Sequence, residues 1–160
     1  MRLLIAAIGK LKDAEERGIC ERYAKRLSVS GKPLGLGPLE ILEFPESRAE
    51  DIDARKANEA ARLLKTASGS ALTIALDEHG RHYPSDVFAK LLGKQACSGV
   101  KTCAFLIGGP DGHGPEALKA ADFKMSLGTM TLPHGLARVV LIEQLYRAAT
   151  ILSGHPYHRG

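Results

Sequence analysis

Residues 106–117, Leu106-Ile107-Gly108-Gly109-Pro110-Asp111-Gly112-His113-Gly114-Pro115-Glu116-Ala117, decide the fold of this chain. An apolar strand runs here into four glycines and then into the start of a helix. Glycine lets the backbone approach a ligand closely, and a helix start offers free N–H donors. A strand that leads through a turn into a helix is the repeating unit of α/β proteins.

The same alternation extends in both directions from this segment. Apolar runs predict five strands, over residues 2–9, 39–44, 71–76, 100–107 and 123–127. Helical spacing predicts helices over residues 13–28, 47–66, 85–95, 115–121 and 135–152, with a capping box at Ser47–Glu50 and a cap at Ser85. Residues 29–38 hold three Gly and two Pro and predict a flexible loop. Continuously apolar strands that alternate with helices predict a parallel sheet with helices on both faces.

The composition predicts one domain over residues 1–160, because a chain of this length buries a sufficient core by itself. Cys20, Cys97 and Cys103 are odd in number and match no zinc-ligand spacing, so we expect buried thiols in a reducing cytosol and no metal. The apolar start of the chain is too short for a signal peptide, and no run could cross a membrane. We therefore expect a cytoplasmic protein. A net charge of +4 with 5% aromatic residues permits a polyanionic partner without requiring one.

The last predicted helix is apolar over most of its circumference, whereas a surface helix has a single apolar stripe. Such a helix is either buried within the domain or packed on a second subunit. A chain of this length has little interior in which to surround a helix, so we favour a subunit interface.

Ligands of parallel sheets bind beyond the carboxyl ends of the strands, which here means residues 77–84, 108–114 and 128–135. Residues 112–117 match the dinucleotide pattern G-x-G-x-x-A, but no acidic residue ends a strand about 20 residues later and Pro115 removes one N–H. A Walker loop is excluded because no Lys-Ser/Thr pair follows. A pocket wall for an adenosine-type ligand and an ordinary tight turn both remain open.

Two further segments carry polar groups. Pro133 fixes the backbone ahead of the last helix, and Thr129 and Thr131 are suited to local capping. The tail, residues 153–160, holds two His, one Tyr and one Arg. Such a tail is either a frayed terminus or part of a functional site. In a site, Tyr could stack on a base, His could accept a proton, and the Arg guanidinium could bind an anion.

Four blocks in order, LIGGPDG at 106–112, SLGTMTLPH at 126–134, ARVVLIEQLYRA at 137–148 and HPYHR at 155–159, resemble the RlmH family of SPOUT-class rRNA methyltransferases. Residues 7–10 and 23–26 are also similar to the start of that family. The resemblance implies an α/β fold with a C-terminal trefoil knot and S-adenosyl-L-methionine as cofactor. It also implies a homodimer whose partner helps to complete each site. The implied reaction is methylation of N3 of a pseudouridine in the 23S rRNA of the large subunit, with the assembled ribosome as substrate.

The resemblance also implies site residues. Those expected to bind the cofactor are Leu76, Gly108, Gly109, Gly128, Thr129, Met130, Thr131, Leu132 and Pro133. Those expected to serve catalysis are His134, Tyr157, His158 and Arg159. Those expected to contact RNA are Arg138, Arg147, Tyr157 and Arg159. For Arg138 and Arg147, surface solvation or an ion pair with Glu143 is an equal alternative, and His134 could be an ordinary helix-start residue.

Methyl transfer needs alignment and exclusion of water more than covalent help. The imide proton of N3 must leave before the nitrogen attacks, so a nearby base or cation would serve. Two departures from the family pattern stand out: residues 29–38 form a longer loop, and Gly128 replaces a small polar residue. A ribosome-associated binding module without catalysis and a dinucleotide-dependent oxidoreductase are the competing classes.

Overall fold

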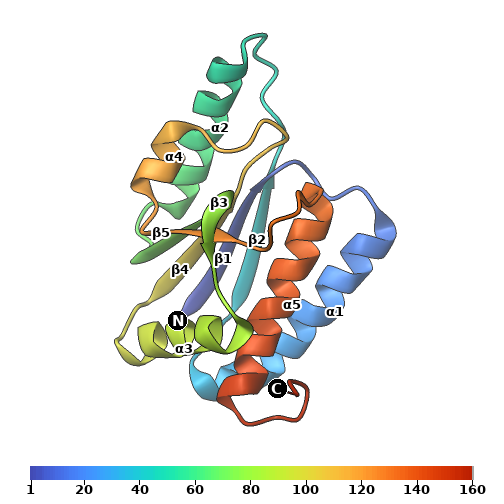
Figure 1. The fold of residues 1–160 in the computed structure, drawn as a ribbon, viewed down its shortest axis with the longest axis vertical. Coiled ribbons are helices and arrows are strands. Elements are labelled where there is room, and N and C mark those ends of the chain that lie inside the picture. Colours follow the sequence, from blue (N-terminus) through green and yellow to red (C-terminus); the bar gives the residue numbers. More distant parts are fainter. Residues whose placement is uncertain (160) are drawn as a thin grey trace.

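The computed structural model describes residues 1–159; Gly160, the last residue of the tail, lies outside the described residues. Strands and helices alternate along the chain, as the sequence predicts (Figure 1). In chain order they are β1 (Arg2–Ile8), α1 (Ala14–Gly31), the 3-10 helix η1 (Lys32–Leu34), β2 (Leu39–Phe44), α2 (Ile52–Ala67), β3 (Leu72–His82), α3 (Ser85–Cys97), β4 (Thr102–Ile107), α4 (Pro115–Ala120), β5 (Phe123–Ser126) and α5 (His134–Leu152).

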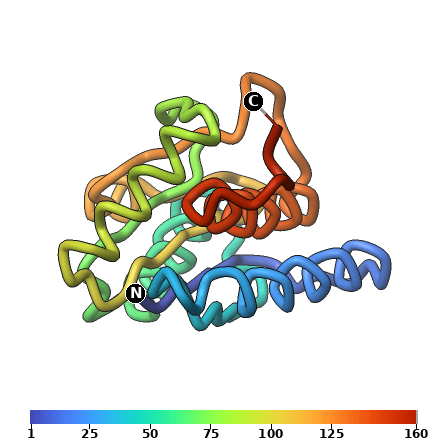
Figure 2. The backbone as a smooth tube through the Cα atoms, turned by 90° about the horizontal axis from the view of Figure 1, so that it is seen from below, coloured from blue at the N-terminus to red at the C-terminus, as the bar shows by residue number. Residues whose placement is uncertain are grey.

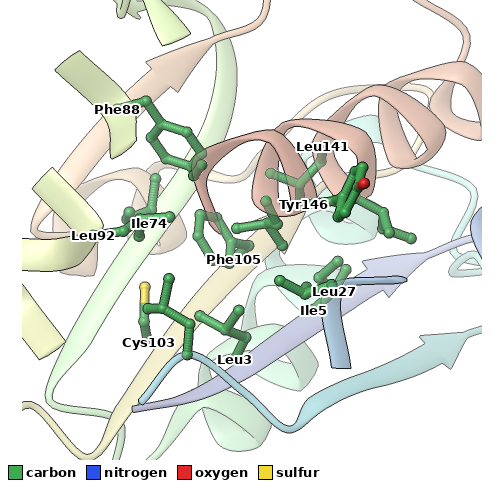
Figure 3. Close-up of a cluster of buried hydrophobic side chains, with 14 of the residues drawn as sticks. Leu3, Ile5, Leu27, Ile74, Phe88, Leu92, Cys103, Phe105, Leu141 and Tyr146 are labelled. Carbon is green, nitrogen blue, oxygen red and sulfur yellow. The ribbon is translucent and has the colours of Figure 1, made fainter. Parts of the chain in front are cut away.

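The five strands form one sheet in the order β2-β1-β4-β3-β5, and every pair of neighbouring strands is parallel. Alternate residues of each strand face opposite sides, so Leu3 and Ile5 join one buried cluster while Leu4 and Ala6 join another. Helices α1, α3 and α5 cover the larger cluster, which Figure 3 shows, and α2 covers the smaller with α4 beside it. Figure 2 shows helices on both sides of the sheet. The predicted fold class is confirmed.

Strand β5 lies between two parts of β3. Met125 pairs with Leu76 on one side and with Arg81 on the other, and the register of β3 shifts between these two residues. A strand residue has only two sides for pairing, so the chain passes from one edge of β5 to the other over residues 77–80. Gly80 makes this passage possible, because a Cβ there would lie 2.7 Å from backbone atoms of Lys124 and Met125. The trefoil knot itself stays a prediction.

Several local expectations were wrong, and one is the end of the third strand, because β3 continues past residue 76 to His82. Helix α2 begins at Ile52 with Asp51 as its cap, because the N–H of Ser47 donates instead to the buried Glu59, 2.8 Å away. Residues 29–38 are not one flexible loop, since α1 continues to Gly31 and the chain is held there by buried Leu36. The hydroxyl of Ser85 does not cap α3 but donates to Gln144.

Helix α5 packs along the sheet and contacts α1 and α3 (Figure 1). Leu141, Leu145, Ala148 and Ala149 are fully buried within the chain. Much of the apolar character that suggested a subunit interface is therefore explained by burial in the domain itself. An outer strip of the helix that includes Leu136, which is 43% exposed, remains uncovered.

The cysteines only partly follow the expectation. All three thiols are free, and burial raises the pKa of Cys103 to about 12, while Cys97 is exposed at the end of α3. Within residues 1–159, no group of three or more His, Cys, Asp or Glu side chains could hold a metal ion. In the same residues, no helix is long and apolar enough to cross a membrane.

Candidate active site

A cavity of about 770 Å³ opens where β4 and β5 end and where β3 leaves its first pairing at Leu76. This is the edge of the sheet at which ligands of α/β proteins bind, and the volume lies in the range of small-molecule sites. Its walls come from three segments of the chain: the end of the first part of β3, the turn after β4, and the stretch from β5 into α5. A ligand that fills the cavity would contact all three. The lining residues are 76–78, 107–113, 125–128, 130–134 and 137.

The glycine turn of residues 108–112 forms one wall. A Cβ on Gly108 would lie 3.0 Å from the backbone of Gly112, and one on Gly109 would lie 2.7 Å from Oε2 of Glu59. The turn closes through the N–H of Gly112, which donates to the carbonyl of Gly109 at 2.9 Å. Glycine is thus required by the packing of the turn, and the same turn faces the cavity. The segment is therefore a tight turn and also a wall of the cavity, and the binding of an adenosine-type ligand against it stays a prediction.

Helix α2 holds the glycine turn from behind. Nε of Arg55 lies 2.8 Å from Oδ2 of Asp111, and this hydrogen bond lowers the pKa of the Asp111 carboxyl. Oε1 of Glu59 accepts from Ser47, whereas its Oε2 faces Gly109 without a partner among the described residues. Asp111 is therefore occupied in fixing the turn rather than free to act as a base.

His113 lies in the wall of the cavity but is only 6% exposed. Neither ring nitrogen makes a well-formed hydrogen bond within residues 1–159, although the backbone of Leu106 and Leu76 lies close enough to favour the charged ring. Burial disfavours the charged ring and lowers the pKa of His113 below its usual value. The imidazole is therefore neutral near pH 7, and burying its nitrogens without well-formed hydrogen bonds costs stability.

The variant His113→Leu, without ligand, is expected to melt about 2–6 °C higher than the wild type at pH 7, because a buried polar group without a well-formed hydrogen bond is removed. The unfolded chain binds a proton at His113 near pH 6.5, whereas the folded chain does so only at lower pH. Wild-type stability therefore falls as pH drops through 6.5, and the gap to the variant widens toward pH 5. Thermal unfolding across this range measures it; a constant gap would contradict a buried neutral His113.

The segment before α5 forms the opposite wall. The hydroxyl of Ser126 donates to the carbonyl of Gly128 at 2.7 Å and closes the turn there. Pro133 directly precedes α5, as predicted, and His134 begins the helix at the cavity edge. The His134 ring packs on Gly9, where an added Cβ would lie 3.2 Å from Nε2. His134 is therefore a cavity residue held in place by the end of β1.

Of the residues expected to bind the cofactor, all but one line this cavity. The exception is Thr129, which is exposed and stands outside the lining. The chain bends at residues 129 and 130, and Met130 rather than Thr129 borders the cavity. Cofactor contact by the others stays a prediction.

Arg138 was wrongly placed at the RNA surface. It is 1% exposed, forms an ion pair with Glu43 and donates from Nη2 to the carbonyl of Gly9 at 2.9 Å. A guanidinium so enclosed cannot reach a phosphate. Arg138 instead ties α5 to the ends of β1 and β2.

Arg147 forms the ion pair with Glu143 that the sequence analysis gave as the alternative to RNA contact. Its Nη2 lies 2.6 Å from Oε1 of Glu143, and its guanidinium carbon lies 4.8 Å from the ring centre of Tyr157. The carboxylate raises the pKa of Arg147. The guanidinium is committed to these two side chains rather than to solvent.

The tail does not reach the cavity of its own chain. Helix α5 has 19 residues and is roughly 28 Å long, with His134 at one end and the tail at the other. Tyr157 folds back only as far as Glu143. Within the described residues, the cavity lining ends at Ala137. The structure therefore brings His134 to the expected cofactor residues, but not Tyr157, His158 or Arg159.

Other cavity residues were not foreseen as site residues. Asp77, Glu78, Ser126 and His113 all line it. All but Ser126 lie in the segments that follow predicted strands, where the sequence analysis expects ligands to bind. Their position directly after an apolar strand could have identified them as site residues. Ser126 lies two residues before the third of those segments.

Fold and cavity together define an α/β protein that binds a small ligand at the strand ends of a parallel sheet. A family model described as "Predicted SPOUT methyltransferase" matches residues 1–158. Similar sequences include the "Ribosomal RNA large subunit methyltransferase H" of Brucella anthropi, 45% identical with 99% of each chain covered. The protein of that name from Xanthobacter autotrophicus is 46% identical, again with 99% of each chain covered.

Solved structures agree on the fold. A probable methylase family protein from Haemophilus influenzae superposes with a TM-score of 0.55 at 15% identity, covering 99% of this chain and 70% of that one. A probable methyltransferase from Bordetella pertussis gives 0.55 at 14% identity, covering 92% and 96%. The chain belongs to the SPOUT methyltransferase family. The predicted enzyme class and its methyl donor, S-adenosyl-L-methionine, follow from this membership, in place of an oxidoreductase or a binding module without catalysis.

Proposed function

We propose that this protein methylates N3 of a pseudouridine in 23S rRNA, with the assembled ribosome as substrate and the cytoplasm as its place of action. The full-length similarity to proteins named as large-subunit rRNA methyltransferases supports the substrate class. The observation that carries the proposal is a cavity at the strand ends, bordered by apolar side chains and a glycine turn, that suits an adenosyl ligand. A chain of 160 residues with a net charge of +4 offers few RNA contacts alone, which favours an assembled particle as substrate.

The cavity suits S-adenosyl-L-methionine. Apolar side chains of Leu76, Ile107, Met130 and Leu132 border it and can pack on the faces of adenine. Backbone groups of the glycine turn can bracket its edge, because no side chain covers them. Asp77 and Glu78 at the rim complement a cationic ligand. The cofactor supplies an activated methyl group on a sulfonium.

The residues of the chain must then align the base with the methyl group and accept the proton that leaves N3. N3 of the base loses its imide proton and forms the new N–CH₃ bond, and the electron pair of the broken C–S bond stays on sulfur. His134 lies at the cavity edge, where a proton acceptor is needed. A guanidinium such as that of Arg159 would stabilise the deprotonated base. Closure of the cavity by RNA would exclude water.

A second copy of the chain completes each site in this proposal. The tail of one chain would meet the cavity of the other, because its own cavity lies at the far end of α5. Exposed apolar residues support a protein contact near the cavity: Met130 in its lining is 82% exposed, and Leu136 in the first turn of α5 is 43% exposed. A two-fold axis would create two identical composite sites.

We expect light scattering to give about twice the chain mass of 17.1 kDa. The variant Leu136→Asp places a charge on the exposed strip of α5 and should shift the protein to monomers without loss of helical content. Its methylation should fall with the dimer fraction. A wild-type protein that is monomeric at assay concentrations would contradict a shared site.

The function is tested with labelled S-adenosyl-L-methionine and three substrates: whole ribosomes, large subunits and naked 23S rRNA. We expect label to enter the large-subunit RNA of whole ribosomes, and digestion with mass spectrometry to place it on N3 of one pseudouridine. Cells that lack the gene should lack this modification until the gene is restored. Label on another nucleotide, or none on any of these RNAs, would refute the proposal.

A further inference from the structure

The tail is folded onto α5 and α1 by a small polar and aromatic cluster. The Tyr157 ring packs on Tyr146 with 4.7 Å between ring centres. Its hydroxyl lies 3.0 Å from Oε1 of Glu143 and 3.3 Å from the hydroxyl of Tyr23. A phenol has one hydrogen, so Tyr157 donates to the carboxylate and accepts from Tyr23. This links α1, α5 and the tail at one point.

Glu143 is the centre of this cluster, and its side chain is only 15% exposed. Its Oε1 accepts from Nε and Nη2 of Arg147, at 3.0 and 2.6 Å, as well as from Tyr157. Its Oε2 accepts from the amide of Gln144 at 2.7 Å. Hydrogen bonds to a partly buried carboxylate are stronger than neutral ones. Removal of its charge would therefore weaken every contact at once.

The cluster partly buries some side chains of the tail and leaves others exposed. Tyr157 and His158 are half-buried, and Nδ1 of His158 lies 3.3 Å from Nη1 of Arg147. Arg159 is exposed, and no ion pair holds it among residues 1–159. A short terminal segment is ordinarily frayed, and ordering it costs about 1–2 kcal/mol of entropy per residue. The cluster orders the tail before any partner binds.

We infer that Glu143, assisted by Tyr23, is a positioning residue that fixes the tail so that Arg159 projects toward the cavity of the partner chain. The inference rests on the proposed function. Neither residue belongs to the cavity, and each acts through Tyr157. Methyl transfer would thus depend on a carboxylate that never touches cofactor or base.

The test uses the full-length variants Glu143→Gln and Tyr23→Phe, with Glu46→Gln as a control on an exposed carboxylate distant from the tail. Hydrogen exchange of residues 155–159 should be at least tenfold faster in Glu143→Gln. Its kcat for rRNA methylation should fall about 10–100-fold, as expected for a misplaced catalytic group. Tyr23→Phe should give a smaller loss, and Glu46→Gln none. The Kd for S-adenosyl-L-methionine should stay within twofold in all three.

Two results would overturn the inference. One is a Glu143→Gln variant whose tail exchanges faster while its kcat stays at the wild-type value. The other is a Kd for S-adenosyl-L-methionine that rises in proportion to the loss of kcat, which would mean that Glu143 supports cofactor binding. If Glu143→Gln does not fold, Tyr23→Phe and Tyr157→Phe carry the same readouts. A wild-type protein that methylates no rRNA refutes the proposed function instead. In that case, unchanged tail exchange in Glu143→Gln would still refute the anchor, and faster exchange would support it.

Discussion

A chain that ends at His155 is expected to bind S-adenosyl-L-methionine as the wild type does, while its methylation of ribosomes falls by about 100-fold or more. The cavity lies at the opposite end of α5 and takes no lining residue from the tail among residues 1–159, so cofactor affinity should survive. The loss removes Tyr157, His158 and Arg159 together. Calorimetry with the cofactor and methyl incorporation into ribosomes measure the two properties on one sample.

A mixing experiment shows whether the tail acts on its own chain or on its partner. Ala137→Trp, which fills the cavity from the first turn of α5, should be inactive with an intact tail. After subunit exchange with the truncated chain, about half of the dimers are mixed and each holds one complete site. Activity should therefore return to about one quarter of wild type. No recovery despite exchange would mean that the tail serves its own cavity, and weak cofactor binding by the truncated chain would mean that the tail belongs to the cofactor site.

The largest expected effect on stability comes from Gly80→Ala. The added Cβ would lie 2.7 Å from the backbone of Lys124 and Met125, and neither strand backbone can move without breaking the pairing of β3 with β5. We expect a loss of about 3 kcal/mol or more in the free energy of unfolding, or no folded protein. Chemical denaturation followed by circular dichroism measures it.

Gly18→Ala is the matched control. Gly18 lies within α1, and a Cβ there would meet nothing within 4 Å. Alanine should gain about 0.5–1 kcal/mol of stability at this position through its better helix propensity. If both variants unfold at the same denaturant concentration, the crossing of β3 over β5 is not as close as described.

The sequence alone predicted the structure correctly where neighbouring residues determine it without distant partners. Residues 39–44 hold four apolar residues and two glutamates between Pro38 and Pro45, and they form β2 with the predicted bounds. The glycine turn was predictable as a cavity wall, because strand ends and glycines both mark ligand sites in parallel sheets.

Prediction failed where distant residues decide the outcome. Ser47 and Asp51 are both good caps, and the choice depends on Glu59, which takes the N–H of Ser47. Arg138 lies on a helix that is apolar nearly all round, so periodicity could not indicate which of its charges faces inward. Its partners, Glu43 and Gly9, are 95 and 129 residues away. Thr129 lies in a bend next to Met130, and the side-chain directions in such a bend follow no sequence period.

The contacts of Arg138 also bear on how the protein is made. The carbonyl of Gly9 and the carboxylate of Glu43 gain the Arg138 guanidinium only when α5 is in place, and β1 pairs with β4 far along the chain. Such non-local contacts form late and slow folding. During synthesis, the first hundred residues emerge with one face of β1 uncovered and must wait for the last helix. A nascent chain that stalls before α5 would therefore expose apolar strands to chaperones and proteases, so an incomplete copy is removed rather than left as a partial enzyme.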